Sequence, residues 1–212
     1  MTVDPRIVEA WVRGWALARE APPPVAAFGG YRVDVGLPDQ QARYVFPSAS
    51  QGVREAAAAI DAPHIFLKIC TAPDEAQKQL TAGWVIQPPG FMMDCSALNP
   101  GQGRLGGGYR MRVSHERSAV RVQIVTTDDG ALAAYGTLVS VDGYAIFDRI
   151  NTHIDHRRRG LGRAVMEGLS RSACEQGASH GLLVATADGR ALYEALGWRL
   201  HTLYTTAIRP AC

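Results

Sequence analysis

The feature that most constrains the fold is a turn rich in glycine and arginine between a strand-like and a helix-like segment. Residues 144–154, YAIFDRINTHI, resemble a strand, and residues 160–174 have apolar positions at helical spacing. Between them, HRRRGLGRAV (156–165) puts four arginines and two glycines into ten residues. Such a turn aligns backbone N–H groups with the positive end of the helix dipole, and glycines let an anion approach closely. The segment therefore predicts a pyrophosphate site at a strand-to-helix connection.

The overall charge argues against a nucleic-acid footprint. The formal net charge of the 212 residues is only +2, so the arginine cluster is a local feature. Arg149 and Arg171 lie near it in sequence, but no aromatic platform is interleaved with these cations. A polyanion-binding surface would also show steeply salt-dependent affinity for DNA or RNA. We expect no nucleic-acid partner.

Cysteine usage and hydropathy limit the class of protein further. The four cysteines are scattered, without CxxC or Cys/His spacing, which argues against a zinc site and a dense disulfide framework. The first residues carry charge and no apolar leader, and no apolar run approaches the roughly 18 to 20 residues that a membrane span needs. We expect a soluble cytoplasmic protein with no membrane partner.

The expected elements alternate between strands and helices, which indicates an α/β (α+β) protein with a partly parallel sheet. The first half is expected to hold a helix opening at Asp4 and Pro5, strands 29–35 and 42–46, helix 53–60, strand 64–70 and helix 74–80. After a strand-like YRMRV (109–113), the second half is expected to hold strands 120–127, 131–141 and 144–154, helix 160–174, strand 181–186, helix 188–196 and strand 198–208. Asp142-Gly143 predicts a hairpin turn.

The two halves resemble each other. GGYRVDV (29–35) is similar to GGYRMRV (107–113), and each half reaches a Gly-Trp pair before its last extended segment. A tandem of related units and a chance match remain open alternatives. NPGQGRLGGG (99–108) contains GxGxxG, but no strand precedes it and no helix follows, so it is interpreted as a linker. The expected division is therefore 1–98, linker 99–108 and 109–212.

Two motifs in the second half stand in a specific order. RRRGLG (157–162) fits the pattern R/Q-x-x-G-x-G/A, and LYEALGW (192–198) follows about thirty residues later, with a strand and helices expected between them. Together they resemble the GNAT superfamily of acyl-CoA-dependent N-acyltransferases over residues 109–210. The resemblance implies a mixed β-sheet flanked by helices. It also implies acetyl-CoA, or another acyl-CoA, as acyl donor, with no metal.

The resemblance implies a binding site made largely of main chain. Backbone amides of the turn would hold the CoA pyrophosphate, and pantetheine would pair with the strand edge where two parallel strands separate. The residues expected to bind acyl-CoA are Ile150, Thr152, Ile154, Arg157, Arg158, Arg159, Gly160, Leu161, Gly162 and Arg163. Thr152 would also mark a bulge whose backbone N–H faces the thioester oxygen.

Beside Thr152, the resemblance implies two further catalytic candidates, Tyr193 and Asp148. Tyr193 matches the position of the general acid, and its hydroxyl stays protonated at neutral pH, although it could equally be a packed helix tyrosine. Strand alternation puts Asp148 on the same face as Thr152, where it could act as general base or form a salt bridge. His153 is a weaker candidate base. His153 and His156 lack a third partner as metal ligands.

The chain departs from the family in its acceptor region. The family usually has two helices between its first two strands, and YRMRVSHERSAVRVQIVTT leaves no room for them. The first half would then supply the acceptor wall as a degenerate unit, because FPSASQG (46–52) replaces its phosphate loop. We expect transfer of an acetyl group to a primary amine of a small molecule in a ternary complex. The alternatives are a protein amine acceptor and a non-catalytic acyl-CoA sensor. Either a monomer or a homodimer fits.

Overall fold

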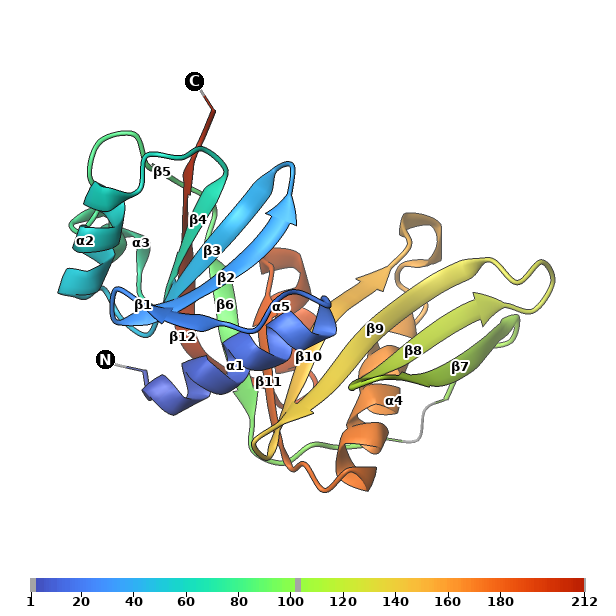
Figure 1. Ribbon diagram of the computed structural model, residues 1–212. Helices are drawn as coiled ribbons and strands as arrows, with labels where there is room; N and C mark the ends of the chain where they lie inside the picture. The colour runs from blue at the N-terminus through green and yellow to red at the C-terminus, as the bar shows by residue number, and fades with distance from the viewer. Residues whose placement is uncertain (1–2, 102–103, 212) are drawn as a thin grey trace. The chain divides into compact units, whose positions relative to one another are not determined.

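The computed structural model describes residues 3–101 and 104–211. Residues 102–103, in the middle of the expected linker, lie outside this part. The chain forms two compact units, of which unit 1 comprises the described residues within 1–93, 184–190 and 200–212, and unit 2 those within 94–183 and 191–199 (Figure 1). The units are thus not contiguous in sequence, and the division at 99–108 stays a prediction about chain segments.

Unit 1 is built on a mixed sheet with the order β1-β2-β3-β4-β12, and β5 also pairs with β12. Only β3 and β4 are parallel among these pairs. Their bounds are β1 Val25–Ala27, β2 Gly30–Leu37, β3 Gln40–Phe46, β4 Ile65–Ile69, β5 Val85–Ile86 and β12 Arg199–Arg209; β6 is Gly90–Cys95. The last strand of the chain therefore completes the sheet of unit 1.

Helices cover both faces of this sheet. α1 (Pro5–Ala18) begins as expected, because the Asp4 side chain accepts a hydrogen bond from the Arg6 N–H and Pro5 occupies the first turn. Its apolar side, with Trp11 and Trp15, is buried, and it contacts β2 and β3. α2 (Gln51–Ala59) packs with α3 (Pro73–Gln77) against a core that includes Phe46, Leu67 and Ala207. α3 ends three residues earlier than expected.

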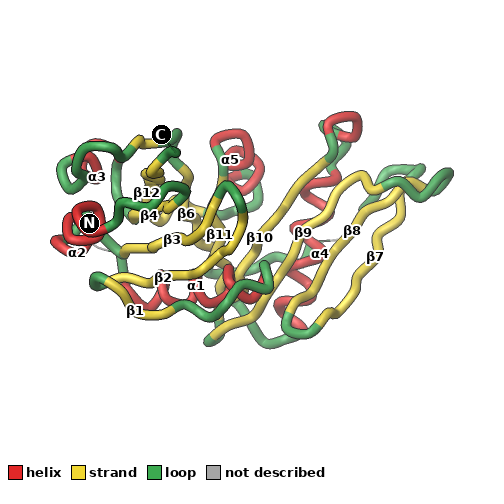
Figure 2. Tube along the Cα trace, turned by 45° about the horizontal axis from the view of Figure 1, so that its top comes forward, coloured by secondary structure: helices red, strands yellow, loops and turns green. Residues whose placement is uncertain are grey.

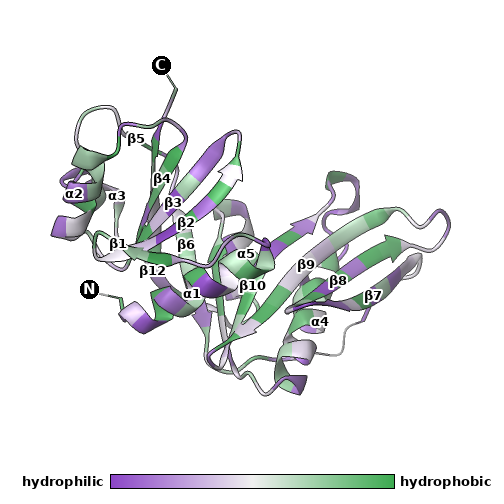
Figure 3. Ribbon diagram, in the orientation of Figure 1, coloured by the Kyte–Doolittle hydropathy of each residue, from purple (hydrophilic) through white to green (hydrophobic). Residues whose placement is uncertain are grey.

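Unit 2 has a mixed sheet in the order β7-β8-β9-β10-β11, in which only the last pair is parallel. The bounds are β7 Tyr109–Glu116, β8 Ala119–Thr126, β9 Leu132–Val141, β10 Tyr144–Thr152 and β11 His180–Ala185. Asp142 and Gly143 have φ of +51° and +82°, which confirms the tight hairpin between β9 and β10. Apolar and polar residues alternate along much of β8 (Figure 3), whereas β11 is apolar from Leu182 to Ala185.

One long helix lies on the sheet of unit 2. α4 (Leu161–Glu175) contacts β8, β9 and β10, and it buries Val165, Met166 and Leu169 (Figure 2). A short 3-10 turn, Ile154–His156, connects β10 to the loop before α4, and α5 (Ala187–Glu194) follows β11. Strand, loop and helix therefore meet at the HRRRGLGRAV segment, as the sequence predicts.

Candidate active site

A β-bulge interrupts β10 between Asp148 and Asn151. Asp148 pairs with Thr137 of β9 and Asn151 pairs with Tyr135, so β10 contains one extra residue between these pairs. Arg149 adopts a φ of +55° there, an uncommon conformation for a residue other than glycine. The bulge thus lies at Arg149 and Ile150 rather than at Thr152.

The bulge corrects the predicted faces of the strand. Because partners in register share a face, Asp148 and Asn151 lie on one side of the sheet. Ile150 and Thr152 lie on the side of α4: a Cβ built at Gly136 would meet Ile150 together with α4 side chains, and one at Gly162 would lie 3.6 Å from Thr152 Oγ1. The prediction that Asp148 shares a face with Thr152 is therefore wrong, because the extra residue lies between Asp148 and Asn151 and not at Thr152.

Beyond the bulge, the edge of β10 that faces away from β9 does not pair with β11. Pairing with β11 extends from Tyr144 to Ile146, whereas β10 continues to Thr152. The His153 N–H donates to Ala133 O at 2.8 Å, so by strand alternation the Thr152 N–H points away from β9. Ile154 was expected on this edge, but it lies in the 3-10 turn and its side chain is exposed. The usable edge ends near Thr152.

The loop after β10 presents backbone donors. Gly160 has a φ of +77° and caps α4 without a side-chain hydrogen bond. The first hydrogen bond of α4 runs from the Ala164 N–H to Gly160 O at 3.1 Å. The N–H groups of Leu161, Gly162 and Arg163 come before it and have no acceptor within the helix. A Cβ at Gly160 would meet open space, whereas one at Gly162 would lie 3.0 Å from Leu192 Cδ2. The first turn of α4 can therefore hold an anion.

A hydrogen-bonded network that the sequence analysis missed holds this loop. Arg159 Nη1 donates to the Tyr109 hydroxyl at 2.9 Å, and the same hydroxyl lies 3.0 Å from His156 Nδ1. The two rings meet edge to face with centroids 5.7 Å apart. Arg157 Nε donates to Thr152 O at 3.4 Å. Two of the loop arginines thus contact neighbouring protein groups, and no local pattern around Tyr109 indicates this.

Tyr193 and Asp148 are both buried near the bulge. Their residues are 7% and 8% exposed. Burial, and then the charge of Asp148, raises the pKa of the Tyr193 hydroxyl to about 12. The Tyr193 ring lies beside Trp198, with centroids 6.3 Å apart, and Trp198 meets Phe147 of β10 edge to face at 5.1 Å. LYEALGW therefore places Tyr193 against β10 and keeps its hydroxyl neutral.

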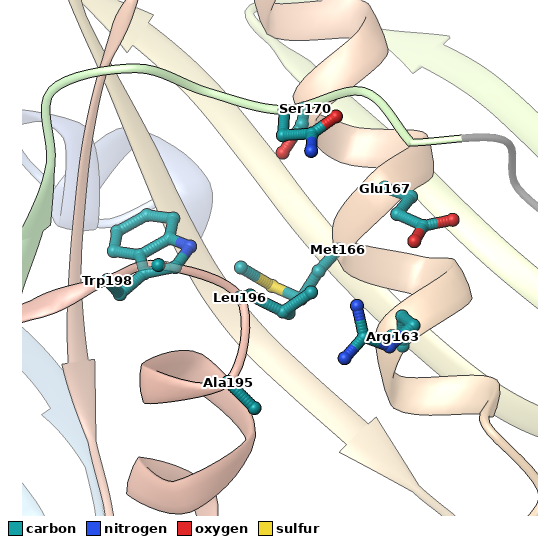
Figure 4. Close-up of a pocket in the computed structure, with 9 residues that line it drawn as sticks. Arg163, Met166, Glu167, Ser170, Ala195, Leu196 and Trp198 are labelled. Carbon is teal, nitrogen blue, oxygen red and sulfur yellow. The ribbon is translucent and has the colours of Figure 1, made fainter.

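A cavity of about 260 Å³ lies between α4 and the turn after α5 (Figure 4). Apolar side chains of Met166, Leu196 and Trp198 line it together with the polar side chains of Arg163 and Glu167. The remaining lining residues are Asn99, Ser170, Ala195 and Gly197. Arg163, which the sequence assigns to the phosphate loop, thus also borders this cavity.

No group of three His, Cys, Asp or Glu side chains in residues 3–101 and 104–211 gathers as metal ligands would. His153 and His156 stand with ring centroids 5.9 Å apart, and His153 Nδ1 lies 3.4 Å from Asp155 Oδ2. Among the described residues, no helix is long and apolar enough to span a membrane.

Comparisons with known proteins relate one segment of the chain to a family model and the whole chain to a fold. Residues 121–200 match the family model described as an acetyltransferase (GNAT) domain. A comparison with curated proteins found no match. A GCN5-related N-acetyltransferase from Kribbella flavida superposes with a TM-score of 0.68 at 17% identity, covering 100% of this chain and 97% of the other.

Two further solved structures are similar. A GCN5-related N-acetyltransferase from Sphaerobacter thermophilus has a TM-score of 0.65 at 13% identity, with 100% and 96% of the two chains covered. A tandem GNAT protein from the clavulanic acid biosynthesis pathway has a TM-score of 0.56 at 14% identity, with 81% and 76% covered. At these identities the likeness establishes the fold.

Proposed function

We propose, on the premise that residues 121–200 carry a GNAT acetyltransferase domain and that the chain has the GNAT fold, that this protein is an N-acetyltransferase. It moves an acetyl or related acyl group from acyl-CoA to a primary amine of a small molecule. The acceptor attacks the thioester directly while both substrates are bound.

The observation that carries this proposal is the continuity of an open strand edge with a helix N-terminus. The β10 edge ends at Thr152, and the first turn of α4 begins only nine residues later at Leu161. An extended amide-containing arm can hydrogen-bond to such an edge, while a pyrophosphate accepts from the N–H groups of the helix. Acyl-CoA is a ligand that combines these two parts in this order.

The residues of the chain then have separate tasks in the transfer. The amine nitrogen attacks the thioester carbonyl carbon, the C–S bond breaks, and the negative charge passes to sulfur. Backbone N–H groups beyond the bulge, including that of Thr152, are available to the developing oxyanion. The ordinary pKa of a thiol is about 8.5, well below the pKa of about 12 at Tyr193, so Tyr193 stabilises the departing thiolate as a hydrogen-bond donor rather than by complete proton transfer.

Asp148 is the candidate for accepting the proton of the amine. It is buried and lies on the face of β10 that is opposite to α4. An acceptor that reaches Asp148 must therefore approach from that face, while the arm of acyl-CoA follows the strand edge. This separation suits a ternary complex, in which neither substrate has to leave before the other binds.

Unit 1 is proposed as a degenerate copy that binds no acyl-CoA. Its parallel pair β3 and β4 stays in register to the end, at Phe46 and Ile69, and the Cys70 N–H donates to Phe46 O at 2.9 Å. At the start of α2, a Cβ built at Gly52 would lie only 1.7 Å from Phe28 O, so a main-chain carbonyl fills the place of a phosphate. The donor site is then confined to unit 2.

The experiment that tests this function has two stages. Calorimetry should detect CoA binding to the intact chain, and incubation with labelled acetyl-CoA and pooled primary amines should yield an acetylated product in mass spectrometry. Binding without any turnover across the pool would support an acyl-CoA sensor instead. No affinity for CoA would overturn the proposal altogether.

A further inference from the structure

One face of the sheet in unit 1 carries a row of polar side chains on three neighbouring strands. Arg43 lies on β3, Lys68 on β4 and Thr206 on β12. Lys68 and Thr206 are direct partners in register, and Lys68 Nζ donates to Thr206 Oγ1 at 2.8 Å. Arg43 and Thr206 are each 8% exposed, and Lys68 is partly buried. The alternate residues of these strands pack into the apolar core on the other face, which makes this polar row unusual.

Aromatic rings border the row. The Arg43 guanidinium lies 3.5 Å from the centroid of the Trp15 ring, and Arg19, at the end of α1, lies 5.0 Å from the same centroid. Lys68 Nζ is 5.4 Å from the Phe66 ring and 6.0 Å from the Tyr204 ring. Three cations thus gather among flat apolar surfaces.

The charged groups that shift the pKa of Lys68 are both positive. No salt bridge joins Lys68 to a carboxylate within the described ranges 3–101 and 104–211, and its hydrogen-bond acceptor is a neutral hydroxyl. Burial, and then the charges of Arg43 and Arg19, lowers the pKa of Lys68 to about 7. Both arginines take part in other interactions as well, but their effect at Lys68 is repulsive.

Two other titratable groups of these strands, Cys70 just after β4 and Tyr204 on β12, are uncharged. Burial raises the pKa of the Cys70 thiol to about 12, and mainly burial raises the pKa of the Tyr204 hydroxyl well above its ordinary value. Both stay protonated at neutral pH. A charged ammonium at this place is costly unless an anion joins it.

The choice of lysine here is chemically distinctive. Of the 22 Lys and Arg residues, only Lys68 and Lys78 are lysines, so arginine is the usual cation of this chain. Arginine cannot lose its proton in a protein, whereas a buried lysine can be neutral when alone and charged when a partner arrives. Lys78 is exposed and forms an ion pair with Glu75 at 2.6 Å, so the two lysines differ in burial and in the kind of partner.

We propose that Arg19, Arg43, Lys68 and Thr206 form a binding site for the carboxylate of a small organic acid, whose apolar body packs against the surrounding rings. We call these four residues the Lys68 cluster. The site belongs to unit 1 and does not depend on the proposed acyl transfer. Binding is accompanied by uptake of a proton at Lys68. A singly charged carboxylate suits this largely buried cluster better than a phosphate, because a dianion loses more hydration on burial.

Lysine labelled with ¹³C at Cε gives the test, because the chain holds only two lysines. The Lys78→Arg variant assigns the two NMR signals, and each is titrated with pH in the absence of CoA. Saturating benzoate should raise the midpoint of Lys68 by at least one pH unit and leave that of Lys78 unchanged. Benzoate affinity should then fall by up to about tenfold per pH unit above pH 7.

Matched ligands and variants make the test decisive. Benzamide has the same ring without the charge and should not bind. Lys68→Met should lower benzoate affinity at least tenfold while keeping a folded protein, since it removes a partly buried charge, and Lys78→Met should bind like the parent chain. An unmoved Lys68 signal, or equal binding by Lys68→Met, overturns the proposal. A response to inorganic phosphate but not to benzoate overturns the assignment of the ligand class.

Discussion

At the scale of single residues, the two glycines of the loop before α4 have different tasks. A Cβ at Gly162 would lie 3.0 Å from Leu192 Cδ2, so Leu192 would have to move, while Gly160 has a positive φ and open space where a Cβ would stand. Gly162→Val should therefore push α4 from its neighbour and lower CoA affinity by at least tenfold in calorimetry. Gly160→Ala should lower the free energy of unfolding by about 1 to 2 kcal/mol, because alanine is strained at this positive φ.

The arginines provide the matched comparison for these glycines. Arg158 adopts a φ of +64°, so Arg158→Gly removes the side chain and relieves backbone strain at the same time. We expect this variant to weaken CoA binding only severalfold. If Arg158→Gly abolished binding while Gly162→Val left it intact, the loop would act as a basic patch and not as a backbone cradle.

Tyr193→Phe separates hydrogen bonding from packing. The variant keeps the buried ring beside Trp198 and removes only the hydroxyl, so kcat should fall by about 10²-fold while KM for acyl-CoA stays the same. Because the pKa of Tyr193 is raised to about 12, its hydroxyl stays protonated up to roughly pH 11. Any alkaline fall in kcat below that pH should therefore persist in the variant. Its disappearance in Tyr193→Phe would contradict this role.

Residue patterns predicted some of this site and missed the rest for physical reasons. RRRGLG and LYEALGW are local signals, and they located the loop and Tyr193. The bulge at Arg149 has no such signal, because arginine is not a residue that favours a positive φ, and one extra residue reversed the predicted face of Thr152 relative to Asp148. The contact of Tyr109 with Arg159 joins positions 50 residues apart, which a local pattern does not encode.

At the scale of elements, the two parallel strand pairs differ in a way that predicts how many CoA molecules one chain binds. β10 and β11 stop pairing at Ile146, but β3 and β4 pair to the last residue of each strand. Calorimetry should therefore give one CoA per chain, and the Gly162→Val variant should lose that single site. Two sites per chain, or a residual site in the variant, would mean that unit 1 also binds the donor.

Most elements were predictable because their signals are local. Asp4 and Pro5 fixed the start of α1, and Asp142-Gly143 fixed the hairpin between β9 and β10. The partner of β12 was not predictable, since pairing across the chain depends on which sheet has an open edge. The sequence division assigns this strand to 109–212, yet it pairs with β4 and β5 in unit 1.

At the scale of the whole molecule, Lys68 links stability to pH. Its folded pKa of about 7 lies below its ordinary value of 10.5, so between these values the unfolded chain binds one proton more than the folded chain. Unfolding in this window takes up one proton, which becomes less favourable as the pH rises, so the free energy of unfolding rises by up to about 1.4 kcal/mol per pH unit. The destabilisation is largest below pH 7 and disappears above the unfolded pKa.

Cys70 opposes this trend at higher pH and sets the window for the measurement. Its folded pKa of about 12 lies above its ordinary value of 9.0, so its contribution to stability is present below pH 9 and is lost as the pH rises beyond it. Urea unfolding should therefore be followed from pH 7 to 8.5, where the parent chain is expected to gain stability relative to Lys68→Met. Titratable groups common to both chains contribute equally to the two unfolding free energies, so the difference reports on Lys68. The unfolding free energy of Lys78→Met should change with pH in the same way as that of the parent chain. A constant difference between the parent chain and Lys68→Met across this window would mean that Lys68 has an ordinary pKa and that its burial has no electrostatic cost.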